Sequence, residues 1–124
     1  MAGTIVANTI NTDTGLFSTN NAYNGIAKAW VYFTGSTGTV VNSFNVSSVT
    51  RNSTGNYTVN YTTSMPNANY AFLTGGGSGT TATVAPVFEM AGTPTTSATT
   101  FCVYLRSTGA TTDETYTYAM TIGS

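Results

Sequence analysis

The segment GNYTVNYTTSMPNANYAFL, residues 55 to 73, constrains the fold more than any other part of the chain. Near its start, apolar residues alternate strictly with uncharged polar ones: Tyr57, Val59 and Tyr61 against Thr58, Asn60 and Thr62. A period of two residues is the pattern of a β-strand with one face in the core and the other in water. We therefore predict a half-buried strand here, with Tyr57, Val59 and Tyr61 in the core.

Similar short patterns recur along the chain with turn residues between them, and no helical period is sustained. We expect strands over residues 4–10, 27–33, 39–44, 47–51, 56–62, 70–73, 84–90, 99–105 and 115–122. Gly55 lies in the turn of a predicted hairpin, where a positive φ is often needed. The GGGSG run at 75–79 has no Lys-Ser or Lys-Thr after it and opens no helix, so we expect a mobile loop. These strands predict an all-β fold, an antiparallel β-sandwich of the jelly-roll or Ig-like type.

The first 25 residues differ from the rest, because their apolar positions are followed by a polar stretch that is too irregular to form a sheet by itself. We expect residues 1–25 to be an N-terminal arm for attachment or oligomerisation, and residues 26–124 to be the β-sandwich domain. The arm would contact a neighbouring subunit or a larger particle through its apolar side chains, which are Ile5, Val6, Ile10, Leu16 and Phe17.

Composition limits the possible partners. Only 6% of the 124 residues are charged, the formal net charge is −1, and the basic residues are Lys28, Arg51 and Arg106. So few cations cannot neutralise a row of phosphates or hold an anionic membrane surface, so we expect neither nucleic acid nor a membrane as partner. A net charge near zero permits self-association, and we expect a homo-oligomer.

Side chains that could carry catalysis are scarce. The chain has no His, which removes the commonest general base and metal ligand. Asp113 and Glu114 are adjacent and leave an extended strand on opposite faces, whereas Asp13 and Glu89 could be brought together by the fold. The single cysteine, Cys102, has apolar neighbours and is expected to be a buried thiol. We predict no enzyme activity, no cofactor and no metal.

Trp30 lies in the run KAWVYF, in which both faces of a strand would be apolar. We expect this strand to be central and buried, with Trp30 in the core and not on a ligand platform. Tyr116 and Tyr118 alternate with Thr115 and Thr117, which indicates either core or a subunit interface. The complete set of predicted core residues is Trp30, Tyr57, Val59, Tyr61, Tyr70 and Phe101.

Four motifs resemble a module of tailed-bacteriophage proteins, as found in cyanophages and marine phages. They are AKAW at 27–30, SFNVSS at 43–48, GNYTVN at 55–60 and MPNANY at 65–70, in the order and spacing of that module. The start of the chain, with TIVANTI followed by TDTG, also resembles such phage proteins. After Leu73 the resemblance is limited to a general β pattern.

The resemblance implies a non-enzymatic structural protein of the virion surface, either a tail-fibre or appendage protein or a capsid decoration (cement) protein. Such a protein acts in assembly, particle stabilisation or host adhesion. Its partners would be copies of itself, forming a trimer, other virion proteins of the capsid or tail, and a host surface glycan. It would be made in the host cytoplasm and released by lysis. The alternative from another class is a carbohydrate-binding module of a secreted protein, which requires exposed, coplanar aromatic rings.

Overall fold

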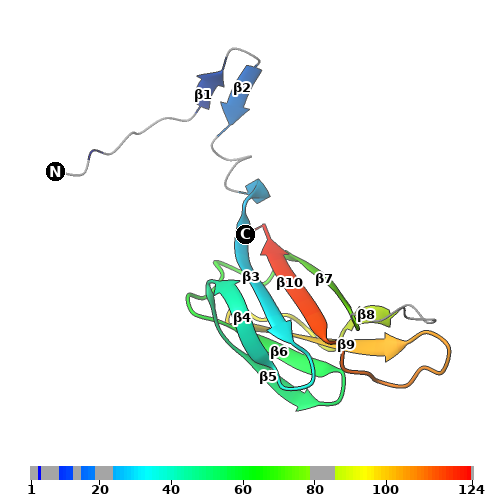
Figure 1. Ribbon diagram of the computed structural model, residues 1–124. Helices are drawn as coiled ribbons and strands as arrows, with labels where there is room; N and C mark the ends of the chain where they lie inside the picture. Colours follow the sequence, from blue (N-terminus) through cyan, green and yellow to red (C-terminus); the bar gives the residue numbers. More distant parts are fainter. Residues whose placement is uncertain (1–2, 4–8, 13–14, 19–23, 79–85, 124) are drawn as a thin grey trace.

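The computed structural model describes residues 3, 9–12, 15–18, 24–78 and 86–123. Within these residues the chain is all-β, and two four-stranded antiparallel sheets pack face to face (Figure 1). The predicted antiparallel β-sandwich is therefore confirmed. The division into an arm over 1–25 and a domain over 26–124 stays a prediction, although the first strand of the sandwich begins at Ala27.

The first sheet has the strand order β4-β3-β10-β7 and the second has the order β5-β6-β9-β8. The strands of the first sheet are β3 (Ala27–Thr34), β4 (Thr39–Phe44), β7 (Ala71–Gly77) and β10 (Tyr116–Ile122). Those of the second are β5 (Val46–Ser53), β6 (Asn56–Tyr61), β8 (Pro86–Met90) and β9 (Ala98–Leu105). Below we call them the β3 sheet and the β6 sheet.

The strand order matches the Ig-like alternative and not the jelly roll. We take β5 as the equivalent of the first strand of an Ig constant domain. The order β5-β6-β9-β8 then corresponds to the first, second, fifth and fourth strands, which form one of the two sheets of such a domain. The third and sixth strands, β7 and β10, pair in the other sheet. The place of the seventh strand beside β10 is taken by β3, which comes from the beginning of the sandwich.

Two local predictions were wrong. Gly75, Gly76 and Gly77 belong to β7, where they pair with Tyr118, Thr117 and Tyr116 of β10, and do not form a mobile loop. Backbone hydrogen bonding to a long neighbouring strand keeps these glycines extended in spite of their low β propensity. The N-terminal segment also contains a two-stranded sheet, β1 (Thr9–Thr12) paired with β2 (Gly15–Ser18), where we expected no sheet. Figure 1 shows this hairpin apart from the sandwich.

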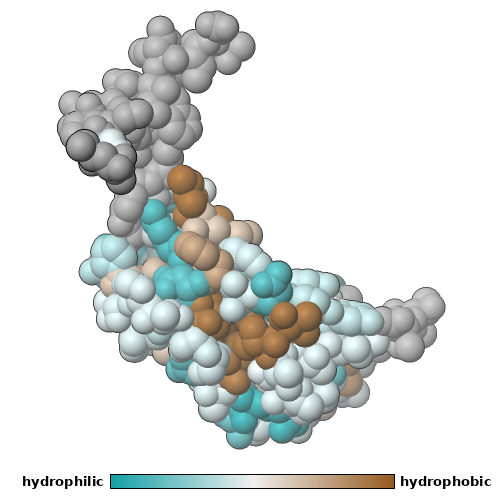
Figure 2. Space-filling model, turned by 60° about the vertical axis from the view of Figure 1, so that its left-hand side comes forward, coloured by the Kyte–Doolittle hydropathy of each residue, from teal (hydrophilic) through white to brown (hydrophobic). Residues whose placement is uncertain are grey.

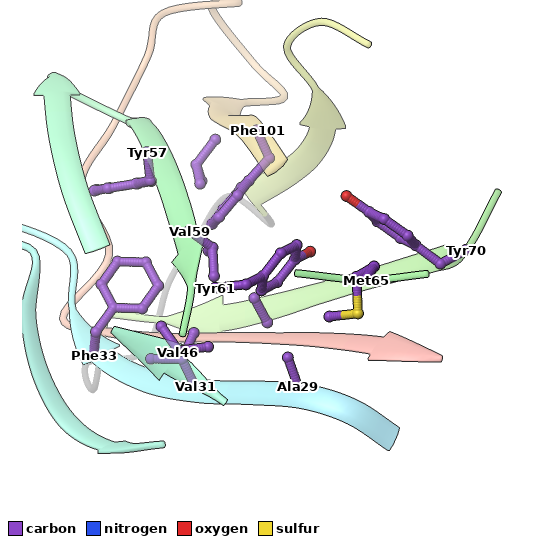
Figure 3. Packing of buried hydrophobic residues seen from close by; sticks show 12 residues of the cluster. Ala29, Val31, Phe33, Val46, Tyr57, Val59, Tyr61, Met65, Tyr70 and Phe101 are labelled. Atoms are coloured by element: carbon purple, nitrogen blue, oxygen red, sulfur yellow. The ribbon is translucent and has the colours of Figure 1, made fainter. Parts of the chain in front are cut away.

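The core lies between the inner faces of the two sheets (Figure 3). Five of the six predicted core residues are buried there: Tyr57, Val59, Tyr61, Tyr70 and Phe101. The rings of Phe33, Tyr57 and Phe101 contact one another at centroid separations of 5.1 to 6.4 Å. The alternation along β6 is therefore confirmed, because its odd-numbered side chains fill the core and its even-numbered ones lie on the outer face.

Tyrosine hydroxyls buried in this core join the two sheets. The hydroxyl of Tyr61 lies 2.8 Å from that of Thr99 on β9 and 2.9 Å from that of Thr121 on β10. The Tyr70 hydroxyl donates to the Thr95 carbonyl at 2.7 Å and also contacts Thr99. Burial raises the pKa of Tyr70 above its ordinary value, so this phenol stays neutral over the physiological range.

Candidate functional site

A row of large apolar side chains crosses the outer face of the β3 sheet. In the strand register, Phe44 lies opposite Trp30, Trp30 opposite Met120, and Met120 opposite Leu73. Residues directly opposite one another share a face of the sheet, so these four form one row over all four strands. Phe44, Trp30 and Leu73 are 54%, 37% and 47% exposed. Figure 2 shows a band of hydrophobic residues on the surface of the sandwich, between residues that are mostly near neutral in hydropathy.

The prediction that Trp30 belongs to the core was wrong. Its neighbours on β3, Ala29 and Val31, point to the inner face and are buried, whereas Trp30 points outward. The strand is central in its sheet, as expected, but among the described residues no second layer covers its outer face. Two apolar faces on one strand therefore indicate one core face and one exposed aromatic face. Tyr116 and Tyr118 also lie outside the core, because 42% of the surface of Tyr116 and 50% of that of Tyr118 are exposed.

Tyrosine rings form a second row beside the first. The rings of Tyr32 and Tyr118 stack at a centroid separation of 4.9 Å with 19° between their planes. The Tyr116 ring lies 6.2 Å from that of Tyr32, between centroids, with 43° between their planes. Partial burial, followed by the proximity of Tyr118 and Tyr116, raises the pKa of Tyr32. The three rings therefore form an aromatic cluster over β3 and β10, the two central strands of the sheet.

A hollow of about 500 Å³ opens between the two rows. Trp30, Tyr32 and Tyr118 contribute rings to it, and Leu73 and Met120 contribute aliphatic surface. Among the described residues that line the hollow, none is charged. Its size falls in the range of about 300 to 1,000 Å³ that is typical of small-molecule sites.

Gly75 explains why the hollow exists. It lies opposite Tyr118 on the outer face of β7, and a Cβ placed on it would meet nothing within 4 Å. Gly77, two residues further on the same face, is equally open and lies opposite Tyr116, but it does not line the hollow. The missing side chain at Gly75 leaves space beside the stacked tyrosines.

The lining of the hollow contains polar groups in addition to the faces of aromatic rings. Asn42 of β4 lies opposite Tyr32 and lines the hollow, and its Oδ1 accepts a hydrogen bond from the Ser43 backbone at 2.9 Å. Within the described part of the chain, no hydrogen-bond partner is found for Asn42 Nδ2, Trp30 Nε1 or the Tyr118 hydroxyl. The hollow thus combines apolar ring faces with donors that can serve a ligand.

Over β5, β6 and the adjoining part of β9, the outer face of the β6 sheet has the opposite character, because it carries short neutral polar side chains that bind one another. Asn60 Nδ2 donates to the hydroxyls of Ser48 and Thr50, both at 3.1 Å. The hydroxyls of Thr58 and Thr100 are 2.9 Å apart, and Asn52 Nδ2 donates to Thr58 at the same distance. We call this set the polar ladder.

The carboxylates do not form a catalytic pair among the described residues. Asp113 accepts hydrogen bonds from Arg51 Nη2 at 2.6 Å, from the Gly55 N–H at 2.8 Å and from the Tyr57 hydroxyl at 2.5 Å. Burial by itself raises the pKa of Asp113, but these hydrogen bonds outweigh it and lower the pKa below the ordinary value of 3.8. Burial, together with the hydrogen bond to Asp113, raises the pKa of Tyr57. Asp113 therefore holds the β5–β6 turn, a role that no local sequence pattern indicated.

The other predicted groups lie as follows. Glu114 is buried, at 5% exposed, and Glu89 lies opposite Cys102 on β8 and β9. Cys102 is buried as expected, and its sulfur accepts a hydrogen bond from Asn56 Nδ2 at 3.2 Å. Asp13 lies outside the described residues.

The arm residues cannot be placed in a site. Ile5 and Val6 lie outside the described residues, and Ile10, Leu16 and Phe17 are described only as backbone positions of β1 and β2. Their role in attachment stays a prediction.

The described residues contain neither a cluster of metal ligands nor a membrane-spanning helix. No three His, Cys, Asp or Glu side chains gather where they could hold a metal ion. In the same residues, no helix has the length and apolar character needed to cross a membrane.

Comparisons of the chain with protein-family models, with curated proteins and with solved structures gave no match. The aromatic face is therefore the main guide to function. The sequence did contain a signal for it, since Trp30 and Tyr32 on one strand, and Tyr116 and Tyr118 on another, each share a face.

Proposed function

We propose that this protein is a non-enzymatic structural protein of a bacteriophage virion surface, a tail-fibre or appendage protein or a capsid decoration protein. The observation that carries the proposal is the exposed aromatic face of the β3 sheet. It lies on a rigid sandwich in which only 6% of residues are charged. The resemblance of four motifs to phage virion modules supports the same class of protein.

A surface of this kind is suited to binding. Contiguous apolar patches on soluble proteins mark sites of interaction, and aromatic residues are enriched at such sites. Strand pairing fixes the backbone beneath these side chains, so only their rotamers lose freedom when a partner covers them. By contrast, Asp113 is engaged in holding a turn together. Adhesion and assembly need no reactive group, and this sandwich offers binding surface instead.

The proposal includes self-association and a place in the virion. With a net charge of −1, electrostatic repulsion between copies is weak, and we propose a homotrimer attached to the particle through residues 1–25. Static light scattering of the full-length chain at micromolar concentration tests this oligomer, and a monomeric mass would contradict it.

The experiment for the virion assignment uses particles purified from a lysate by density gradient. Mass spectrometry should detect the protein in the particle fraction, and gold-labelled antibody should mark either the tail or the shell. Copy number separates the two versions, because decoration proteins are present in hundreds and fibres in tens. Absence of the protein from intact particles would refute the proposal.

A second function, a carbohydrate-binding module of a secreted protein, is favoured by one specific observation. Trp30 is exposed and lies in one hollow with the nearly parallel rings of Tyr32 and Tyr118. Exposed rings are one part of what the carbohydrate-binding alternative requires; the Tyr32 and Tyr118 rings are stacked on each other and do not lie side by side in one plane. The particle experiment distinguishes the two functions, because such a module would be found in the secreted fraction of its producer and not in virions.

A further inference from the structure

We propose that the hollow on the β3 sheet binds one ring of a neutral saccharide, stacked against Tyr118 and Trp30. This inference rests on the host-adhesion version of the proposed function and names the class of its ligand.

The first reason is the shape and chemistry of the walls. A pyranose ring has faces covered by C–H groups, and these pack well against the electron-rich face of an aromatic ring. Tyr118 is half exposed while stacked on Tyr32, so one side of its ring is supported and other surface is open. Trp30 adds a second ring to the same hollow, and Met120 adds aliphatic surface.

The second reason is the distribution of polar groups. Hydroxyl groups surround a sugar ring at its edge, and each one needs a hydrogen-bond partner when it leaves water. Asn42 Nδ2, Trp30 Nε1 and the Tyr118 hydroxyl lack partners within the described residues, and all three residues line the hollow. A purely apolar ligand would cover these groups without satisfying them, so the lining favours an amphipathic ring.

The third reason concerns charge. No described residue in the lining is charged, and the nearby tyrosine Tyr32 has a raised pKa and stays neutral. A carboxylate or phosphate inside the hollow would lose hydration without gaining a cation from the residues that line it. The hollow therefore selects neutral sugars over acidic ones.

Gly75 provides the space in which the ring lies. If a second copy of this chain covered the face sheet against sheet, the space over Gly75 would remain as a void unless a side chain filled it, and voids weaken packing. A saccharide ring fills such a space directly. We therefore assign the hollow to a saccharide, and self-association through this face is an outcome that the test must detect.

The chain offers a direct probe, because Trp30 is its only tryptophan. We would label the full-length protein and apply it to an array of neutral and acidic glycans, and then titrate the strongest neutral glycan while recording Trp30 fluorescence. Binding should shift the emission of Trp30 and protect it from quenching by acrylamide. Acidic glycans with the same backbone should bind at least tenfold more weakly.

Two matched variants test the position of the ligand. Gly75→Val places a branched side chain in the hollow without replacing any of its rings, and Gly77→Val makes the same change on the same strand and face outside the hollow. Both sites have open space for the new side chain, and Val favours strands, so both variants should fold. We expect Gly75→Val to lose at least tenfold in affinity and Gly77→Val to bind within twofold of the native protein. Tyr118→Ala should also lose at least tenfold.

Several results would overturn the inference: no binding to any neutral glycan, binding to acidic glycans only, or equal binding by the two valine variants. Light scattering of the same samples tests the remaining alternative, which is self-association of the chain through this face. If Gly75→Val dissociates an oligomer in which Trp30 is protected without sugar, the hollow is an interface between copies and the saccharide assignment is wrong. Each of these results leaves the virion assignment standing if particles contain the protein, so the two proposals can fail separately.

Discussion

Replacing Asp113 by Asn tests whether this carboxylate holds the sandwich together through the β5–β6 turn. The carboxylate accepts from the guanidinium of Arg51, from the Gly55 N–H and from the Tyr57 hydroxyl. An Asn side chain keeps one oxygen for Gly55 and Tyr57 but places an NH₂ group and no charge opposite Arg51. The change therefore removes the ion pair and leaves the neutral hydrogen bonds in place.

The magnitude follows from which groups lose their partners. Arg51 and Asp113 side chains are 29% and 16% exposed, so water replaces part of what the ion pair supplied. A hydrogen bond to a charged group contributes about 1.5 to 3 kcal/mol, and the partial exposure places Asp113→Asn near 1 to 2 kcal/mol. Asp113→Ala also leaves the Tyr57 hydroxyl and the Gly55 N–H without an acceptor, which raises the expected loss to about 3 to 5 kcal/mol.

The effect should depend on pH with a definite sign. The pKa of Asp113 is lowered in the folded protein, so its stabilising contribution is present above the unfolded value and is lost as the pH falls through the folded value. At about pH 7 the native protein should be more stable than Asp113→Asn, and at about pH 2 the difference should shrink. A neutral amide does not titrate in this range.

Urea denaturation followed by far-UV circular dichroism measures the free energy of unfolding of the native protein and of Asp113→Asn. Glu89→Gln, which makes the same chemical change at another carboxylate, is the control. A loss of 1 to 2 kcal/mol corresponds to roughly 4 to 16 °C in Tm for a domain of this size. A difference below about 0.5 kcal/mol at neutral pH, or one that is the same at both pH values, would refute the role assigned to Asp113.

Three further predictions concern the core, a turn and the arm. Phe101→Ala should cost about 3 to 5 kcal/mol in urea denaturation because its ring is 1% exposed, whereas Trp30→Ala should cost clearly less because that ring lies on the outer face. Gly55→Ala should lower Tm strongly, because Gly55 has φ of 65° and its Cβ would lie 2.6 Å from the Val103 carbonyl oxygen; an unchanged Tm in a calorimetric scan would contradict this. Deleting residues 2–24 should leave a cooperative thermal transition but abolish trimer formation or particle binding, and normal incorporation of the deletion variant would show that attachment lies on the sandwich.

The sequence predicted the strands well wherever one face of a strand is polar. Tyr57, Val59 and Tyr61 were placed correctly because the opposite face of β6 consists of Thr and Asn side chains. Only one of the two faces of this strand is apolar, so only that face can lie in the core. Trp30 was misplaced because both faces of β3 are apolar, and periodicity does not tell which apolar face meets a second sheet. That information lies in the sheet order, which depends on contacts far apart in the chain.

The remaining errors also come from long-range contacts. Gly75 is a weak strand former, and only its pairing with Tyr118 keeps it in β7. Asp113 lies 62 residues from Arg51, and a pair so far apart leaves no local pattern in a single sequence. The hollow, which needs Gly75, Trp30 and Tyr118 from three strands, could be found only once the register was known.

The polar ladder has a consequence for the media in which this protein works. Its hydrogen bonds join neutral amides and hydroxyls such as those of Asn60, Ser48 and Thr50, so no member of the ladder gains or loses a proton between acid and alkaline conditions. Dissolved ions screen charges but have little effect on contacts between neutral groups. The hydration of the polar ladder should therefore be nearly the same in fresh water and in brine, and a particle coated with such a ladder would keep its colloidal behaviour when the salinity around it changes.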